Sequence, residues 1–383
     1  MKPPRQSLAL LTVVTLLFAS CAAYTVASPP PAKDALMPPP PTPEEVTVHG
    51  GMYTVKQIAF APDGQTLAAC TRTWDGGEGK DEEVVKLYDL ATLHERLRFR
   101  SAEDFPDRRN PGHWYTNRVH ALAYAPAGQT FATGDDTEVS LWDAQTGRHR
   151  TNLVTKDVVL ALAFAPGGKE LAASFTLPDP WVYDLATGHQ RLTLRGDGIN
   201  KIGYTYRIYA LAYSPDGKMI ATASGDRAVR LYDAADGRKL WTAATPGPVY
   251  SVAFAPDGKT IAAGTDASTA TTSDCAVRLL DAATGRERAA LMLHPTQVCA
   301  LAFTPDGKSL ISLGRRSGVV LWDVAAGKER AIFGRPLLRP ECMALSPDGK
   351  TVALGGFHGD HRGGVITLLE IDGDSFHLRK AKP

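Results

Sequence analysis

A short turn sequence, proline-x-glycine, returns seven times along this chain, each time after an apolar, alanine-rich run. The intervals between successive turn prolines are 64, 40, 49, 41, 49 and 42 residues, which indicates a period of about 40 residues with insertions in three units. A period of this length restricts the fold to a solenoid or a propeller, because each unit must bury its apolar faces against copies of itself. The prolines are Pro62, Pro126, Pro166, Pro215, Pro256, Pro305 and Pro347.

One whole unit lies between residues 210 and 243 and contains four short segments of strand-like composition. No helix-length periodic stretch separates them. A four-stranded antiparallel sheet of this size is too small to be stable alone. The sequence therefore predicts an all-β protein of repeated four-stranded sheets. The segments are residues 210–217, 219–224, 228–233 and 238–243.

The third segment of a unit ends in Trp142-Asp143 and again in Trp322-Asp323. Because related endings recur in order, the chain from about residue 46 to residue 378 resembles the WD-repeat (WD40) family. The resemblance implies a seven-bladed β-propeller that serves as a binding platform. The related endings are Tyr88-Asp89, Tyr183-Asp184, Tyr232-Asp233, Leu280-Asp281 and Leu369-Glu370.

The sequence departs from the family pattern in two ways. The glycine-histidine pair that usually precedes the first strand of a unit is missing, and residues 315–317 lack the turn aspartate that Asp226 keeps in its own unit. The hydrogen-bonded tetrads that tie blades together in the family are therefore expected to be mostly incomplete. A TolB-like envelope propeller, which shares the Pro-Asp-Gly turn, is an alternative, but the strand at residues 229–233 fits the WD pattern better.

Two terminal segments can complete the seventh unit. Residues 45–49 and residues 375–379 both have the composition of an outer strand. Closing a ring with an N-terminal strand beside C-terminal ones is the family habit, and it removes exposed sheet edges. We therefore expect the N-terminal segment to close the ring.

The first 21 residues have the pattern of an export signal. Lys2 and Arg5 precede an apolar run at residues 8–19, which is shorter than the roughly 20 residues that a membrane-spanning helix needs. The ending at residues 17–21 resembles the lipobox of bacterial lipoproteins, although Phe18 replaces the usual leucine, so Cys21 is predicted to carry a lipid anchor. Cleavage near Ala22 or Ala27, which would release a soluble secreted protein, is the alternative.

Residues 22–45 follow as a proline-rich spacer, with eight prolines among residues 28–43. This composition favours an extended polyproline conformation, which reaches about 50 Å over sixteen residues at about 3.1 Å each. A proline-rich ligand for an aromatic groove is the alternative. The predicted organisation is a signal peptide at residues 1–21, a spacer at residues 22–45 and a propeller at residues 46–379. The predicted location is the periplasm or the cell envelope.

The chain is close to electrical neutrality. It has 42 Lys and Arg against 41 Asp and Glu, a formal net charge of +1, and no basic tail. This lacks the electrostatic footprint of a nucleic-acid binder. We expect a protein or a cell-envelope component as partner, no nucleic acid, and a monomer that meets a membrane only through its anchor.

Long insertions fall on one face of the predicted ring. Because neighbouring strands alternate in direction, the Pro-x-Gly turns and the turns after the third strands must share one face. The other face carries the connections that vary in length, and loops without a scaffold duty are where repeat proteins place recognition. We call it the insertion face; its insertions are residues 74–83, 101–116, 196–206, 266–274 and 356–364.

Aromatic residues and arginines gather on the insertion face. Such residues lead interface hot spots, so we predict that this face binds the partner. The alternative is that the aromatic side chains pack on neighbouring loops and the arginines pair with nearby carboxylates. The candidate partner-binding residues are Trp74, Trp114, Tyr115, Arg118, His120, Tyr204, Tyr206, Arg207, Tyr209, Tyr250 and Arg339.

Catalytic and cofactor signatures are weak. His358 and His361 stand three residues apart in a glycine-rich loop, and the acidic residues 75–83 lack the spacing of a calcium loop. Trp241 lies beside a turn that resembles the docking turn of quinoprotein propellers, a family that repeats this tryptophan around the ring. We expect no metal, no cofactor and no enzymatic activity.

A propeller hydrolase or lyase with a site in the central channel is the alternative class. A ring of acidic or histidine residues at the mouth of the inner strands would favour it, but the residues there are too mixed. They are Lys56, His120, Leu160, Tyr209, Tyr250, Cys299 and Glu341.

Four cysteines follow Cys21. Cys299 and Cys342 lie in the inner strands of adjacent units, six and five residues before their turn prolines, so their side chains should face oppositely. A disulfide between them stays open, whereas Cys70 and Cys275 have the pattern of small buried residues.

Overall fold

The structure is a computed structural model of the whole chain. Every described residue lies in the second of its two units, Pro43–Pro383, and the predicted signal peptide, Cys21 and the spacer lie outside the described residues. The described residues are 46–47, 54–74, 81–100, 105–106, 114–115, 118–196, 206–266, 276–315, 317–334, 338–358 and 364–379.

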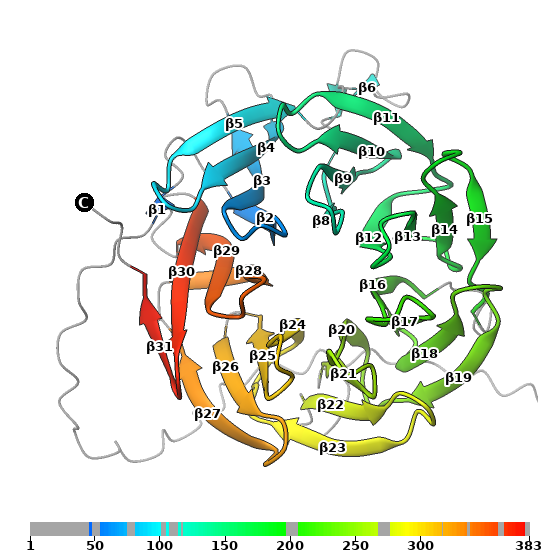
Figure 1. Ribbon diagram of the computed structural model, residues 1–383, viewed down its shortest axis with the longest axis vertical. Coiled ribbons are helices and arrows are strands. Elements are labelled where there is room, and N and C mark those ends of the chain that lie inside the picture. Colours follow the sequence, from blue (N-terminus) through cyan, green and yellow to red (C-terminus); the bar gives the residue numbers. More distant parts are fainter. Residues whose placement is uncertain are drawn as a thin grey trace, which may run out of the picture. The chain divides into compact units, whose positions relative to one another are not determined.

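Seven antiparallel sheets follow one another in chain order around a central axis, and we number them blades 1 to 7 (Figure 1). Blade 1 consists of β2 (Thr54–Phe60), β3 (Thr66–Trp74), β4 (Asp81–Asp89) and β5 (Glu95–Arg100). Blade 2 consists of β8 (Ala121–Tyr124), β9 (Thr130–Gly134), β10 (Glu138–Asp143) and β11 (His149–Val154). Blade 3 consists of β12 (Val159–Phe164), β13 (Glu170–Phe175), β14 (Trp181–Asp184) and β15 (Gln190–Thr193). Blade 4 consists of β16 (Ile208–Tyr213), β17 (Met219–Ser224), β18 (Ala228–Asp233) and β19 (Lys239–Ala244).

Blade 5 consists of β20 (Val249–Phe254), β21 (Thr260–Thr265), β22 (Ala276–Asp281) and β23 (Glu287–Met292). Blade 6 consists of β24 (Val298–Phe303), β25 (Ser309–Gly314), β26 (Gly318–Asp323) and β27 (Lys328–Phe333). Blade 7 consists of β28 (Leu338–Leu345), β29 (Thr351–His358), β30 (Gly364–Asp372) and β31 (Ser375–Leu378), with β1 (Val46–Thr47) added to β30. The described residues contain no helix, so the predicted all-β, seven-bladed propeller is confirmed.

The hydrophobic core lies between neighbouring blades. One cluster joins Leu141 of blade 2 to Val159 and Phe175 of blade 3. Another joins Ile58 of blade 1 to Ala353 of blade 7 and so spans the point where the ring closes. Second and third strands are almost wholly buried, whereas fourth strands face solvent. Each blade therefore depends on both neighbours for its core.

The Pro-x-Gly turns interlock around the ring. Each turn glycine has a φ between 67° and 74°, the left-handed region that glycine adopts without strain. A Cβ placed on Gly128 would lie 3.5 Å from Cδ of Pro62 in the preceding blade, and one on Gly64 would lie 3.8 Å from Cδ of Pro347. The contacts thus form a closed circle, so the recurrence of this turn has a tertiary cause as well as a local one. Going round the ring, the pairs are Gly64–Pro347, Gly128–Pro62, Gly168–Pro126, Gly217–Pro166, Gly258–Pro215, Gly307–Pro256 and Gly349–Pro305.

Both termini share the outer edge of β30. β31 pairs with its last four residues, and β1 pairs with Val365 and Ile366 further along the same strand. Between the two, the backbone N–H of Arg379 donates to the carbonyl oxygen of Leu368 at 2.9 Å. The expectation of a purely N-terminal closure is therefore corrected: β30 has nine residues and β31 only four, so one short strand leaves part of the edge for β1.

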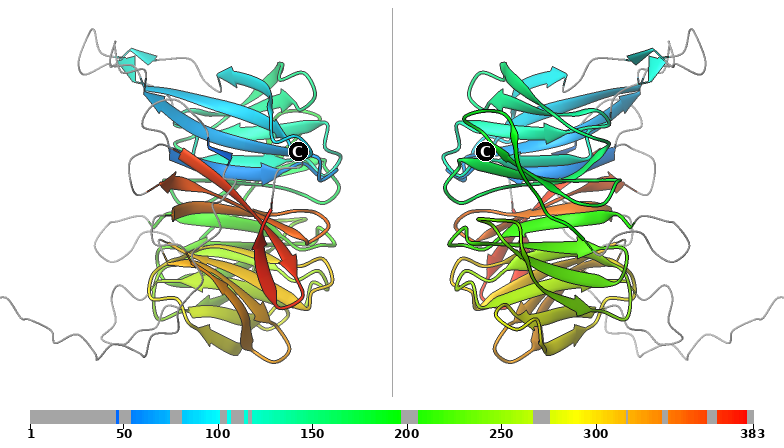
Figure 2. Two further views of the ribbon diagram at one scale, coloured as in Figure 1. Left: turned by 90° about the vertical axis from the view of Figure 1, so that its left-hand side faces the viewer. Right: turned by 90° about the vertical axis from the view of Figure 1, so that its right-hand side faces the viewer.

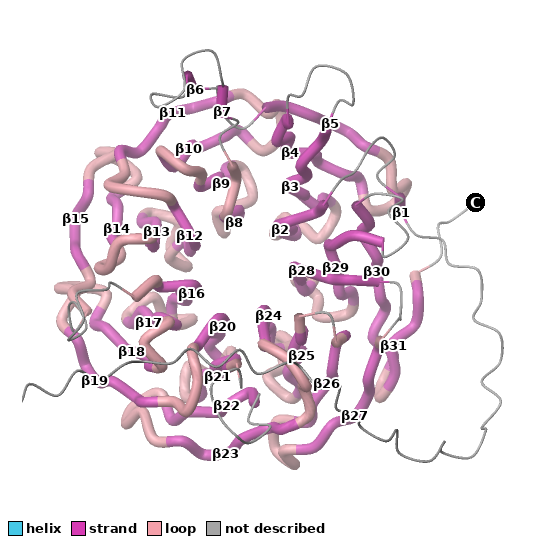
Figure 3. The backbone as a smooth tube through the Cα atoms, turned by 180° about the vertical axis from the view of Figure 1, so that it is seen from behind, coloured by secondary structure: helices cyan, strands magenta, loops and turns pink. Residues whose placement is uncertain are grey.

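The strands run across the thickness of the ring, so each blade has a turn at both faces (Figure 2). The Pro-x-Gly turns and the turns after the third strands lie on one face, which we call the Pro-x-Gly face. The opposite ends of the strands belong to the insertion face. Viewed from behind, the innermost strands β2, β8, β12, β16, β20, β24 and β28 surround the axis (Figure 3).

Candidate functional site

The innermost strands carry one extra residue near the end that opens on the insertion face. In six blades the register between the first and second strands shifts at this residue. A β-bulge of this kind leaves the extra residue unpaired and re-aims its side chain. In blade 2, His120 directly precedes β8, and its N–H donates to Gly134 O at 2.9 Å. The positions expected at the channel mouth therefore share a backbone irregularity; the bulge residues are Lys56, Leu160, Tyr209, Tyr250, Cys299 and Glu341.

Tyr209 and Tyr250, from blades 4 and 5, stack on each other at this mouth. Their ring centroids are 4.6 Å apart and their planes lie at 28°. Gly225 makes room for them, because a Cβ there would lie only 3.2 Å from Cε2 of Tyr209. Burial, with the neighbouring Tyr209 and Asp266, raises the pKa of Tyr250, so its hydroxyl stays neutral. The two half-buried rings form a flat amphipathic surface on which a partner side chain can pack.

A polar cavity of about 320 Å³ lies at the insertion-face end of the axis, lined by residues of blades 1, 2, 6 and 7. Within it, Gln57 Nε2 donates to His120 O at 2.9 Å, and His120 Nε2 lies 2.8 Å from Asp136 Oδ1. Burial opposes ionisation of Asp136, but the hydrogen bond and charge of His120 outweigh it, so the pKa of Asp136 is lowered. Burial raises the pKa of Cys299 to about 12, so this thiol stays protonated and is a poor nucleophile.

Four arginines, Arg118, Arg207, Arg315 and Arg339, are exposed around the mouth and come from four different blades. The guanidinium of Arg339 lies over the Phe357 ring, 5.5 Å from its centroid. Among the described residues, none of the four guanidinium groups forms an ion pair with a carboxylate. Arg315 was not among the predicted partner-binding residues.

The aromatic residues predicted in the insertions are placed differently from one another. Trp74 is the last residue of β3 and pairs with Asp81, so it lies in a strand and not in the expected loop. Trp114 and Tyr115 form β7 (Trp114–Tyr115), which pairs with β6 (Phe105–Pro106) as a small ribbon between blades 1 and 2. Aromatic residues favour β-strands. Strand pairing therefore extends into segments whose polar composition predicts a loop.

The predicted patch of Trp74, Trp114 and Tyr115 lies outside the described side chains, and Tyr204 lies outside the described residues. Tyr206 is described and is 38% exposed. The described part of the site therefore consists of His120, Arg118, Arg207, Tyr206, Tyr209, Tyr250 and Arg339, together with Arg315.

Sequence reasoning missed a series of arginines in the fourth strands. Each lies where the pairing register between the third and fourth strands shifts. Each also follows a turn residue with positive φ by three residues. In blade 4 the residue at this position is Leu240. The three-residue spacing from the turn to the arginine can be read from the sequence, but arginine is common on solvent-exposed outer strands, so the spacing alone does not indicate a role. The residues are Arg96, Arg150, Arg191, Arg288 and Arg330.

A hydrogen-bonded chain in blade 6 forms part of such a tetrad, which stays incomplete because no aspartate stands in residues 315–317. His294, just before β24, lies with Nε2 2.6 Å from Ser312 Oγ, and Trp322 Nε1 donates to the same oxygen at 2.7 Å. Burial lowers the pKa of His294 to about 4, so the ring is neutral near pH 7. The histidine was missed because Leu293 replaces the glycine that usually precedes it.

Other candidate chemistry is sparse within the described ranges. Cys299 and Cys342 are free thiols, and no group of three potential metal ligands comes together there. His358 ends β29, while His361 and Cys275 lie outside the described residues. A search of the described residues for a helix long and apolar enough to cross a membrane finds none.

Comparison with known proteins agrees with the geometry. The family model for the WD domain, G-beta repeat, matches residues 106–143, 198–233 and 238–281. These three segments are similar to WD40 repeats. Each matched segment ends at the aspartate that closes a third strand, Asp143, Asp233 or Asp281, and these matches support a place in the WD40 propeller family.

Curated relatives match part of this chain over part of their own length. A guanine nucleotide-binding protein subunit beta of Zea mays is 28% identical over 52% of this chain and 50% of its own length. Cell division cycle 20.1, cofactor of APC complex, of Arabidopsis thaliana is 26% identical over 44% of this chain and 36% of its own length. Coronin-7 of Mus musculus is 33% identical over 31% of this chain and 12% of its own length. The chain thus spans half or less of these relatives.

Proposed function

We propose that this WD40 propeller is a non-enzymatic scaffold that binds another protein, or a component of the cell envelope, through its insertion face. The observation that carries the proposal is the mouth of the inner strands, where the stacked Tyr209 and Tyr250 lie among arginines without acidic partners in the described residues. Tyrosine and arginine are the residues that contribute most when an interface forms.

Two further observations support this choice. The Pro-x-Gly face is occupied by turns that pack on one another, whereas the insertion face presents the variable connections. Two of the relatives are, by their names, a subunit of a guanine nucleotide-binding protein and a cofactor of a complex, so those proteins work in assemblies. No described cluster at the mouth offers an activated nucleophile, since the pKa of the Cys299 thiol is raised.

The binding proposal is tested by capture from detergent-solubilised envelope with three forms of the full chain. These are the wild type, the Tyr209→Ala/Tyr250→Ala double variant, and Lys259→Ala, which lies after a turn on the opposite face. We expect a specific protein to be retained by the wild type and by Lys259→Ala and lost by the double variant. Loss of one such aromatic anchor weakens binding by about 2 kcal/mol or more, or about thirtyfold. Equal retention by all three forms would contradict the proposal.

We also propose that the chain is exported and anchored by a lipid on Cys21. The support is the sequence alone: an apolar run that ends in small residues and Cys21, followed by a proline-rich spacer. Replacing Cys21 by Ser and fractionating cells tests it. The wild type should partition with membranes and the variant should be soluble; equal solubility of both forms would leave secretion without an anchor.

A further inference from the structure

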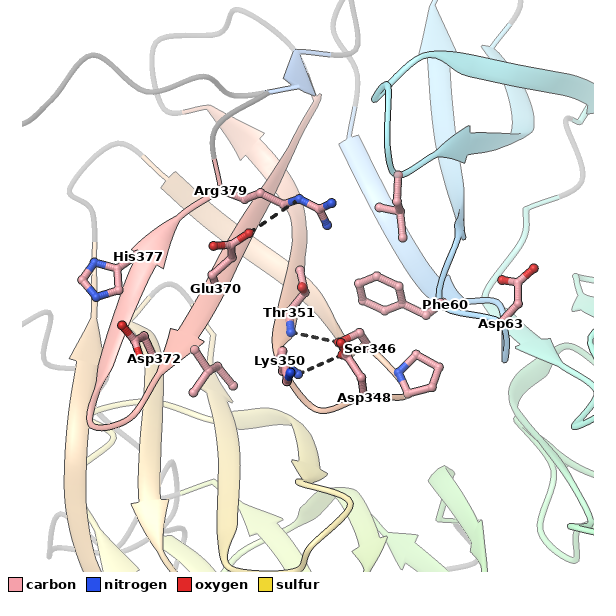
Figure 4. Close-up of a pocket in the computed structure, with 14 residues that line it drawn as sticks. Phe60, Asp63, Ser346, Asp348, Lys350, Thr351, Glu370, Asp372, His377 and Arg379 are labelled. Atoms are coloured by element: carbon pink, nitrogen blue, oxygen red, sulfur yellow. Dashed lines mark hydrogen bonds and ion pairs between the residues drawn. The ribbon is translucent and has the colours of Figure 1, made fainter. Parts of the chain in front are cut away.

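A cavity of about 1180 Å³ lies where blade 7 meets blade 1 on the Pro-x-Gly face (Figure 4). We call it the seam cavity. Its blade 7 wall contains Asp348 from the Pro-x-Gly turn and Asp372 from the end of β30. Its blade 1 wall contains Phe60, Asp63 and Leu90. It is separate from the insertion face, at the other end of the strands.

Other blade junctions show what the molecule itself places at the equivalent position. Arg96 of blade 1 donates to Ala144 O of blade 2 at 3.1 Å, and Arg191 of blade 3 donates to Ala234 O of blade 4 at 2.6 Å. In both cases a guanidinium group binds a carbonyl in the turn after the third strand of the next blade. These two junctions are the chain's own examples of a cation at this position, whereas Arg150 and Arg288 bind groups of their own blades.

Leu90 is the residue of blade 1 that corresponds to Ala144 and Ala234. The N–H of each donates to the backbone just before the second strand, at Gln65 O for Leu90 and Gln129 O for Ala144. Among the described residues no donor reaches Leu90 O. In blade 7, Arg379 is the arginine nearest in sequence to the fourth-strand position that Arg96 and Arg191 occupy in their blades. Its Nε lies 3.8 Å from Glu370 Oε1 of its own blade.

The charges around the seam cavity favour a cation. Four carboxylates line it, against Lys350, Arg379 and His377. Figure 4 shows His377 on the far side of β31, pointing away from the space between the blades. Within the described residues neither Asp63 nor Asp372 forms an ion pair. Phe60 and Leu90 add an apolar wall against which the stem of a long basic side chain can lie.

We propose that the seam cavity is a docking site for a basic segment of a partner protein, in which an arginine side chain binds Leu90 O and one of the carboxylates that line the cavity. The bound arginine then does for blades 7 and 1 what Arg96 does for blades 1 and 2. Arginine fits better than lysine, because its planar fork can bind a carbonyl and a carboxylate at once.

The test is calorimetric titration of the full chain with three blocked peptides: acetyl-Gly-Arg-Gly-amide, its lysine counterpart and its glutamate counterpart. The arginine peptide should bind with one-to-one stoichiometry, the lysine peptide more weakly, and the glutamate peptide not at all. The Asp63→Asn/Asp372→Asn double variant should weaken arginine binding about tenfold or more, since hydrogen bonds to charged groups are the strong ones. Asp257→Asn, in the same turn of blade 5, is the matched control and should change the affinity by less than about twofold.

Each contrary result identifies what is wrong. Equal weakening by Asp257→Asn would mean that the peptide binds turn aspartates in general. Equal binding of the glutamate peptide would remove the charge argument. Binding to Arg379→Gln but not to the wild type would show that Arg379 itself crosses the seam and fills the site. Melting temperatures of all variants show whether each one is folded.

Discussion

The interlocked turns predict that two adjacent glycines respond in opposite ways to the same substitution. Gly168 has a φ of 67° and Gly167 is not in the left-handed region. An added Cβ at Gly168 would lie 3.8 Å from Cδ of Pro126, an ordinary contact, and one at Gly167 would meet nothing within 4 Å. The effect of Gly168→Ala is therefore backbone strain, about 1–2 kcal/mol of lost stability. Gly167→Ala should be neutral or stabilising by up to about 1 kcal/mol, because alanine restricts the unfolded chain.

Urea unfolding of the wild type and both variants at constant pH measures the difference. Gly349→Ala extends the series, since its added Cβ would overlap Cδ of Pro305 and the proline ring has little freedom to move. It should lose a further 1–3 kcal/mol or so through overpacking. Equal free energies of unfolding for Gly167→Ala and Gly168→Ala would refute the reasoning, and so would a milder effect at Gly349 than at Gly168.

Three other contacts give predictions of stability. The pKa of His294 is lowered to about 4 in the folded protein. As the pH falls from about 6.5 to 4, His294 is therefore protonated in the unfolded chain but stays neutral in the folded one. The wild type should then lose up to about 3 kcal/mol that His294→Gln does not lose, and parallel pH profiles of urea unfolding would contradict this. Lys156 Nζ donates to Pro178 O and Asp179 O, so Lys156→Met should lose about 1–3 kcal/mol in thermal unfolding, while Lys156→Arg loses less. Trp241 Nε1 donates to Ala282 O of blade 5 at 2.9 Å, and Trp241→Phe should lose about 0.5–1.5 kcal/mol in the same assay.

Much of the architecture was readable in the sequence because it is repeated. The turn prolines and the endings from Tyr88-Asp89 to Leu369-Glu370 mark every blade, and each recurrence confirms the interpretation of the others. The side to which the insertions belong followed from strand alternation alone. The seven mouth positions, including Tyr209 and Tyr250, were also located by counting back from the prolines.

What the sequence could not reveal depends on contacts between units that are far apart in the chain. The stacking of Tyr209 on Tyr250 requires two bulges and the missing side chain of Gly225, and a bulge has no signature in a strand of ordinary composition. The shared edge of β30 depends on the relative lengths of β30 and β31, which differ from those of the other blades.

The seam cavity shows the same division most clearly. Each blade has a third strand and a following turn that look alike in the sequence, and Leu90 is no different from Ala144 when read along the chain. Local sequence determines each blade, because its strands and turns are short-range structures that the composition specifies. Only the tertiary structure decides which turn carbonyl receives an arginine from the neighbouring blade. The bond from Arg96 to Ala144 O joins residues 48 apart, and the seam brings together the first and last blades of the propeller.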